Sequence, residues 1–311
     1  MTLTQSFIGI DISQAFLDLF DETTATHTRI ANGDADISKL VHGLNGRAVT
    51  IIFEATGSYD RKLALALENA SIAYVRVNPA RARDFARASG YLAKTDAIDA
   101  RMLAAMGRAV TLKTAEPTDP MRTKLAALHK RRDQLVEDRA DDKKRLLQTS
   151  ETEARASINR HVAWLKTEIA KIEKAITVLI ASCPELLDAK ALLETAPGVG
   201  KVTAVALLAG MPELGHRSAK AIAALAGLAP LNNDSGTMRG RRTIKGGRNR
   251  VRRALYMAAL SAIRACPRFR AKYEEIAKRS RSAKLAIIAI ARKLLIALNA
   301  MAKANQPFRW A

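Results

Sequence analysis

The chain has 311 residues, of which 48% are hydrophobic and only two are cysteines, so it can form two folded domains but not a disulfide framework or a zinc knuckle. Its formal net charge of +21 favours a polyanionic partner, and residues 187–311 carry most of it, with 24 Lys and Arg against 6 Asp and Glu. The first residues lack an export signal and no run reaches 18 uncharged apolar residues, so the sequence predicts a cytoplasmic protein without a membrane anchor.

The first third of the chain predicts an α/β domain. Short runs of β-branched and aromatic residues, separated by turn residues, are typical of strands, and the longer amphipathic stretches between them are typical of helices. We predict strands at 6–11, 16–20, 26–30, 49–53 and 73–77, and helices at 37–44, 61–70 and 80–88. Strands come first, as an antiparallel meander, and then alternate with helices.

Four acidic residues stand at places where a metal site could form. Asp11 and Glu54 each end a strand-like run, where the chemistry of an open sheet gathers. Asp96 and Asp99 are three residues apart in a helix-like stretch, so both carboxylates can point at one spot. Acidic groups held together suit a divalent cation with hard oxygen ligands. The alternative is that Thr95 or Asp96 only starts a helix whose acids face solvent.

The middle of the chain predicts two long helices. Residues 121–181 contain no proline or glycine, and apolar residues recur among many charges. This pattern is typical of a helical hairpin or an antiparallel coiled coil. The usual role of such a segment is a spacer or an oligomerisation arm.

The last third predicts a basic helical domain. Residues 192–204 resemble two helices joined by the Pro197–Gly200 turn, a helix-hairpin-helix-like element whose glycines would let backbone amides approach a phosphate. Helices are expected at 221–229, 251–265 and 282–301. From Ser235 to Lys272 there are 12 basic residues and no acidic one, and such a run favours contact with phosphate. The residues that we predict to contact nucleic acid are Gly198, Gly200, Lys201, Arg239, Arg241, Arg242, Lys245, Arg248, Arg250, Arg252 and Arg253.

These motifs, in this order and spacing, resemble the DEDD transposases of bacterial insertion sequences, the insertion-sequence-110 family of bridge-RNA-guided recombinases. The resemblance covers nearly the whole chain. The motifs that carry it are Gly9–Asp11, Phe53–Tyr59, Lys94–Ala100, Pro197–Gly200, Leu225–Pro230, Ser235–Gly236 and Arg253–Ala259.

The resemblance implies a fold and a division of the chain. It implies a RuvC-like, ribonuclease-H-like catalytic domain at 1–115, a coiled-coil helical arm at 116–186 and a basic helical transposase domain at 187–311. Asp11, Glu54, Asp96 and Asp99 would bind Mg²⁺, with Mn²⁺ as an alternative ion. Ser235 would attack the DNA phosphate and hold it as a phosphoserine, so that strands are rejoined without ATP.

The resemblance also implies partners. A structured bridge RNA would pair with target and donor DNA, so that base pairing selects the sequence. The protein would act as a homo-oligomer, a dimer that assembles to a tetramer on DNA, in the bacterial cytoplasm and on the nucleoid when active. Two alternatives stay open: a RuvC-like junction nuclease in which a metal-activated water cleaves, and a helix-hairpin-helix nucleic-acid-binding protein without enzymatic activity.

Overall fold

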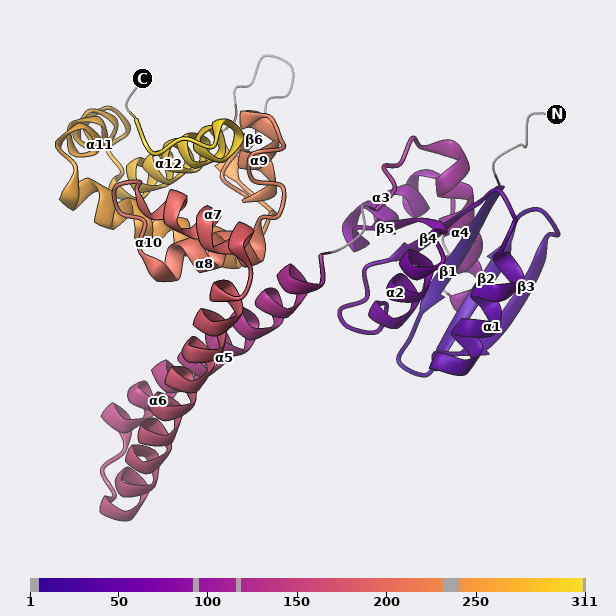
Figure 1. Ribbon diagram of the computed structural model, residues 1–311, viewed down its shortest axis with the longest axis horizontal. Coiled ribbons are helices and arrows are strands. Elements are labelled where there is room, and N and C mark those ends of the chain that lie inside the picture. The colour runs from indigo at the N-terminus through magenta and orange to yellow at the C-terminus, as the bar shows by residue number, and fades with distance from the viewer. Residues whose placement is uncertain (1–5, 92–94, 116–118, 232–239, 241, 310–311) are drawn as a thin grey trace. The chain divides into compact units, whose positions relative to one another are not determined.

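The computed structural model in Figure 1 describes residues 6–91, 95–115, 119–231, 240 and 242–309. They belong to two compact units, Met1–Pro117 and Thr118–Ala311. Unit 1 is a mixed α/β fold, and unit 2 is almost entirely helical.

The sheet of unit 1 has five strands in its described part, in the order β3-β2-β1-β4-β5. The pairs β1–β2 and β2–β3 are antiparallel, and the pairs β1–β4 and β4–β5 are parallel. The bounds are β1 Ser6–Ile12, β2 Phe16–Asp21, β3 Thr26–Ala31, β4 Val49–Glu54 and β5 Ala73–Val77. The five strands predicted from the sequence are confirmed.

Helices cover both faces of this sheet. They are α1 Asp34–Leu44, α2 Arg61–Asn69, α3 Pro79–Ala88 and α4 Asp96–Ala109. Isoleucines at alternate positions of β1 pack in one core with α1 and α2, while Ile52 of β4 packs in another with α3 and α4. Because side chains alternate along a strand, the residues of β1 between those isoleucines face α4. Asp11 is one of them.

Unit 2 begins with a helical hairpin, α5 Pro120–Gln148 and α6 Thr152–Ala181. The two helices run antiparallel: Arg132 pairs with Glu173 at 2.9 Å, and Asp142 with His161 at 2.5 Å. Leu135, Leu165 and Ile169 are buried between them, which explains the recurring apolar positions of the sequence.

The remaining helices of unit 2 pack around one large core into which the base of the hairpin also extends. They are α7 Pro184–Glu194, α8 Lys201–Gly210, α9 Ala219–Leu225, α10 Asn249–Ala265, α11 Pro267–Ser280 and α12 Ala283–Ala304, with a short pair of strands, β6 Pro230–Leu231 and β7 Thr243–Ile244. The sequence did not predict α11 as a helix of its own, nor the pair of short strands. The predicted helix at 221–229 is wrong at its C-terminal end, because the chain leaves the helix after Leu225.

Helix α12 is the one described helix that is long and apolar enough to cross a membrane by length and composition alone. Half of its most apolar stretch is buried inside unit 2, as in the core helix of a globular domain, which meets the same criterion. Its buried apolar residues belong to the core that α8 and α10 share.

Candidate functional site

A row of charged residues crosses the sheet of unit 1 on the face that α4 covers. Directly opposite residues of antiparallel strands share a face, and the register pairs Asp11 with Asp18 and Asp18 with Arg29. On the other side of β1, Ile10 pairs with Phe53 in the parallel strand β4, so the next position places Glu54 beside Asp11. The row therefore runs Arg29, Asp18, Asp11, Glu54 across β3, β2, β1 and β4.

The first turn of α4 brings the other two predicted acids to this row. Thr95 caps the helix, because its hydroxyl oxygen accepts a hydrogen bond from the backbone N–H of Ile98 at 3.3 Å. Asp96 and Asp99 follow in the first turn, where the helix dipole favours negative charge. The sequence alternative that Thr95 starts the helix is thus correct. Its second part, that the acids face solvent, holds only in part, because the side chain of Asp96 is 58% exposed but pairs with Arg29 of the sheet.

Gly9 sets how closely α4 approaches β1. A β-carbon at this position would lie inside van der Waals contact with the carbonyl of Ala100 and 2.5 Å from the backbone nitrogen of Ala104. Helix and strand backbones touch here because glycine has no side chain. Two residues further along the strand, Asp11 lies beside the N-terminal part of α4.

The electrostatics of Asp11 show that the acids share one environment. Burial, followed by the negative charges of Asp99 and Asp96, raises the pKa of Asp11 to about 6. A hydrogen bond from the backbone of Ile12 opposes the rise, and the charge of Asp18 adds a small further contribution to it. Asp99 and Asp96 therefore both act on the charge of Asp11, and the β1–β4 register places Glu54 beside Asp11.

Asp18 and Arg29 are residues of this site that the sequence reasoning missed. Asp18 is only 2% exposed, and its carboxylate accepts from the Nε of Arg29 at 2.9 Å. The same guanidinium donates through Nη2 to Asp96 at 2.8 Å, so it joins the sheet to α4. His27 lies 3.2 Å from Asp18. One signal was present in the sequence: an aspartate between two phenylalanines on one face of a strand.

The donor set fits a hard divalent cation. Carboxylate oxygens are the ligands that Mg²⁺ prefers. Burial, together with the charges of Asp99 and Asp96, raises the pKa of Asp11, and a bound cation would favour the charged form of this carboxyl. Among the described residues, no three His, Cys, Asp or Glu side chains stand close enough to share an ion. In this arrangement Asp96 is paired with Arg29 instead.

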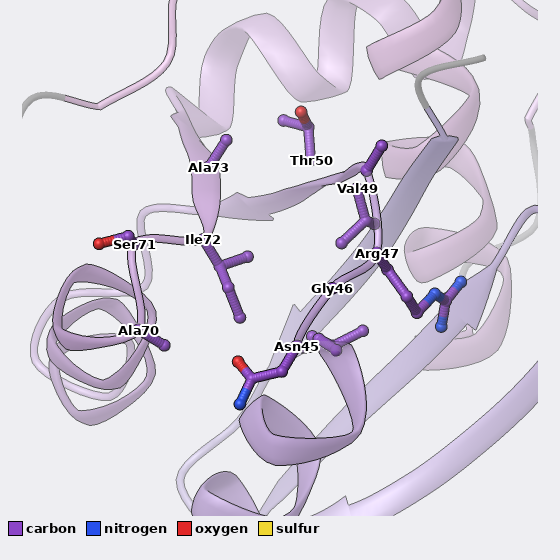
Figure 2. Close-up of a pocket in the computed structure, with 11 residues that line it drawn as sticks. Asn45, Gly46, Arg47, Val49, Thr50, Ala70, Ser71, Ile72 and Ala73 are labelled. Atoms are coloured by element: carbon purple, nitrogen blue, oxygen red, sulfur yellow. The ribbon is translucent and has the colours of Figure 1, made fainter. Parts of the chain in front are cut away.

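The pocket in Figure 2 is not this site. It is lined by the turn after α1 and by the starts of β4 and β5, including Arg47, Thr50 and Ala73. Glu54 stands at the opposite end of β4. The acids lie instead on the carboxyl end of the parallel strands.

The predicted nucleic-acid contacts near the Pro197–Gly200 turn have separate local roles. Gly198 has a φ of +80°, and a β-carbon there would collide with the backbone of Ala258 and Ala262 in α10. A packing requirement thus accounts for this glycine, and its contact with phosphate stays a prediction. Gly200 precedes α8, with open space around it, and Lys201 is exposed at the first helical position.

Four of the predicted arginines make contacts within unit 2. Arg248 forms two 2.6 Å hydrogen bonds to the carboxylate of Glu213 and one of 2.9 Å to the carbonyl of Gly210. Arg252 donates to the carbonyl of Gly246 at 2.7 Å. Arg250 and Arg253 contact acids of α5, Asp133 at 3.8 Å and Glu137 at 2.6 Å. The sequence pattern did not predict these structural roles.

The other predicted residues of this region divide into two groups. Arg242 and Lys245 are exposed, and no carboxylate in the part of the chain that the structure describes is paired with either. Ser235, Arg239 and Arg241 lie outside the described residues. Their roles stay predictions.

Basic residues that pair within unit 2 and basic residues that are exposed without a paired carboxylate should respond differently to substitution by alanine. We expect Arg248→Ala to lower the free energy of unfolding by about 1–3 kcal/mol, because it leaves Glu213 half-buried without its partner. Arg242→Ala and Lys245→Ala should change it by less than about 0.5 kcal/mol. Each should instead lower the salt slope of nucleic-acid binding by about 0.7–0.9. Urea titration and fluorescence anisotropy of labelled DNA between low and high salt measure the two quantities. Equal losses of stability in all three variants would contradict the assignment.

Comparisons with known proteins agree over most of the chain. Residues 8–150 match the DEDD transposase family of IS110 elements, and residues 190–274 match the family described as Transposase IS116/IS110/IS902. The pilin gene-inverting proteins of Moraxella bovis and Moraxella lacunata are each 29% identical to the chain, over 98% of its length and 98% of theirs. An IS110 insertion-element protein of Streptomyces coelicolor is 30% identical over 45% of the chain and 36% of its own length.

Proposed function

We propose that this chain, which belongs to the IS110 family of transposases, recombines DNA with the acids of unit 1 and a serine nucleophile from unit 2. The chain is a DNA recombinase, as its family and its gene-inverting relatives indicate. The observation that carries the proposal is the row of carboxylates along β1 and β4 under the first turn of α4.

Asp11, Glu54, Asp96 and Asp99 would hold Mg²⁺, with Mn²⁺ as an alternative. The ion, when bound, supplies a Lewis acid that neutralises charge on a phosphodiester. The protein contributes the placement: β1 and β4 fix Asp11 and Glu54, and the close approach at Gly9 fixes the helix that carries the aspartate pair. The charge of these groups also keeps phosphate away until a cation is present.

The proposed strand cleavage uses Ser235. Its hydroxyl loses its proton as the oxygen forms a bond to phosphorus, and the bond from phosphorus to one sugar oxygen breaks. That sugar oxygen takes up a proton and leaves as a free hydroxyl, so the step involves no net change in protons. The phosphodiester energy is kept in the serine ester, so a second DNA hydroxyl can reverse the step on a new strand. Exchanging strands in this way suits the inversion of a DNA segment, the activity named for the Moraxella relatives.

We further propose that the basic surface of unit 2 binds DNA and a bridge RNA. In this proposal the protein acts as a homo-oligomer in the bacterial cytoplasm. The net charge and the exposed Lys201, Arg242 and Lys245 support contact with phosphate. The scarcity of aromatic side chains, 5% of the sequence, favours recognition of backbone and shape over stacking on bases.

A covalent-adduct experiment separates this mechanism from a junction nuclease that uses water. The wild-type protein is incubated with Mg²⁺, with labelled donor and target DNA and with the bridge RNA. The mixture is then denatured. We expect a labelled protein band from the wild type and none from Ser235→Ala, because the ester is covalent. Asp99→Asn should also give no band. Cut DNA from Ser235→Ala at the wild-type rate would overturn the serine mechanism and favour the nuclease.

A further inference from the structure

The guanidinium of Arg29 occupies an unusual place: a cation of this chain already sits against one of the acids proposed to hold the metal. Its Nη2 donates to Asp96 at 2.8 Å, and its Nε donates to Asp18 at 2.9 Å. Both contacts are made from one strand, β3, at the end of the row of charges that crosses the sheet. Asp18 is not one of the four acids that are proposed to hold the metal, and Arg29 is not an acid at all.

The two contacts of Arg29 differ in how firmly they are held. Asp18 is only 2% exposed, and a buried carboxylate that loses its partner pays a large desolvation cost. The side chain of Asp96 is 58% exposed, and exposed ion pairs of this kind are weak. The ring of Phe16 lies 5.5 Å from the guanidinium carbon and supports it from the side. Arg29 is therefore anchored at its Asp18 end and easily displaced at its Asp96 end.

We propose that Arg29 is a positioning residue that holds Asp96 before a divalent cation binds and releases this carboxylate to the cation. The inference rests on the proposed function, because it assumes that Asp96 is a metal ligand. Arg29 limits the repulsion between Asp96 and its acidic neighbours while no cation is bound, at the cost of competing with the cation afterwards. The apparent metal affinity is then set in part by a residue that does not bind the metal.

The test measures Mn²⁺ binding by electron paramagnetic resonance in the full-length protein, without DNA, so that no catalytic step is needed. We expect Arg29→Gln to bind Mn²⁺ about two- to fivefold more tightly than the wild type, the range that an exposed ion pair implies. The glutamine amide can still donate to Asp18, which limits the damage to the sheet. Circular dichroism of each variant confirms that it is folded.

Two charge-matched variants separate competition for Asp96 from a change in the overall field. Arg29→Gln combined with Asp18→Asn removes one charge of each sign, and Arg29→Lys keeps the positive charge but loses the planar fork that bridges two carboxylates. Both should bind Mn²⁺ more tightly than the wild type if Asp96 is set free. If only the field matters, both should bind like the wild type, and the proposal is overturned.

A failure of the metal site itself gives a different result. Asp99→Asn is the reference for this: it should weaken Mn²⁺ binding strongly if the acids form the site. Wild-type and Asp99→Asn proteins that bind Mn²⁺ equally would overturn the metal site and with it the role of Arg29. If Asp99→Asn weakens binding and the Arg29 variants match the wild type, only the role of Arg29 is refuted.

Discussion

Asp99→Asn is expected to lower the rate of DNA strand cleavage by about a hundred- to a thousandfold, the effect of removing one group that stabilises charge in a transition state. Asparagine has nearly the same shape as aspartate, but a neutral amide is a poor ligand for a hard divalent cation. The substitution also removes a negative charge beside Asp11, and that charge is one cause of the raised pKa of Asp11. The affinity for DNA should therefore stay the same or rise slightly, because phosphate is repelled less.

Cleavage of a labelled DNA substrate under single-turnover conditions measures the rate of strand cleavage. Fluorescence anisotropy of labelled DNA, with Ca²⁺ in place of Mg²⁺, measures the affinity for DNA. Asp188→Asn is a matched control, because this aspartate of α7 is exposed and belongs to unit 2. It removes the same charge and should cleave like the wild type. An Asp99→Asn protein that cleaves at the wild-type rate with Mg²⁺ would refute the metal site.

The sequence was sufficient to find the acids because their positions follow from local rules. An apolar strand-like run that ends on an acidic residue places that residue at the end of a strand, where the chemistry of an open sheet gathers, and this identified Asp11 and Glu54. Helical spacing then put Asp96 and Asp99 on one face. The structure places these groups where these rules predict, although their roles as metal ligands stay proposals.

Asp18 and Arg29 could not be found in the same way. Their contact depends on the register between β2 and β3, and the contact from Arg29 to Asp96 joins residues 67 positions apart. Strand propensity carries no information on register. Without it, Asp18 is one more polar residue in a short strand, and nothing distinguishes it from an acid that faces solvent.

The basic region shows a second limit of composition. A run of arginines without acids predicts a surface for phosphate, but a partner can come from far away in the sequence. Glu213 is 35 positions before Arg248, and the acids that contact Arg250 and Arg253 lie on α5. Helix α11 was missed for a different reason. Only Cys266 separates α10 from Pro267, and the sequence reasoning did not use this proline as the first residue of a new helix.

Gly9→Ala should have the largest effect on stability of any single methyl group added to unit 1. The new carbon would meet two backbone groups of α4, at Ala100 and Ala104, and backbone atoms cannot rotate away as side chains can. Overpacking of this kind costs about 1–3 kcal/mol or more. The helix can relieve it only by moving off the sheet, which takes Asp96 and Asp99 away from Asp11.

Alanine substitutions at two other glycines of unit 1 serve as comparisons for Gly9→Ala. Gly107→Ala would meet side-chain atoms, the ring of Phe7 at 2.7 Å and the Cδ1 of Ile52 at 2.9 Å. Side chains can move more easily than backbone, so the cost should be smaller than for Gly9→Ala. Gly43→Ala lies on the exposed side of α1 with nothing within 4 Å, and it should stabilise the protein by about 0.5–1 kcal/mol, as expected for alanine in a helix. If close packing of α4 on β1 builds the site, urea unfolding of the full-length protein should give the lowest free energy of unfolding for Gly9→Ala, a higher one for Gly107→Ala and the highest for Gly43→Ala. Because a shift of about 1 Å at a reacting group can cost about a hundredfold in rate, Gly9→Ala should also lose cleavage under conditions where it is still folded. A Gly9→Ala protein that is as stable and as active as Gly43→Ala would show that the helix does not need this contact to position its aspartates.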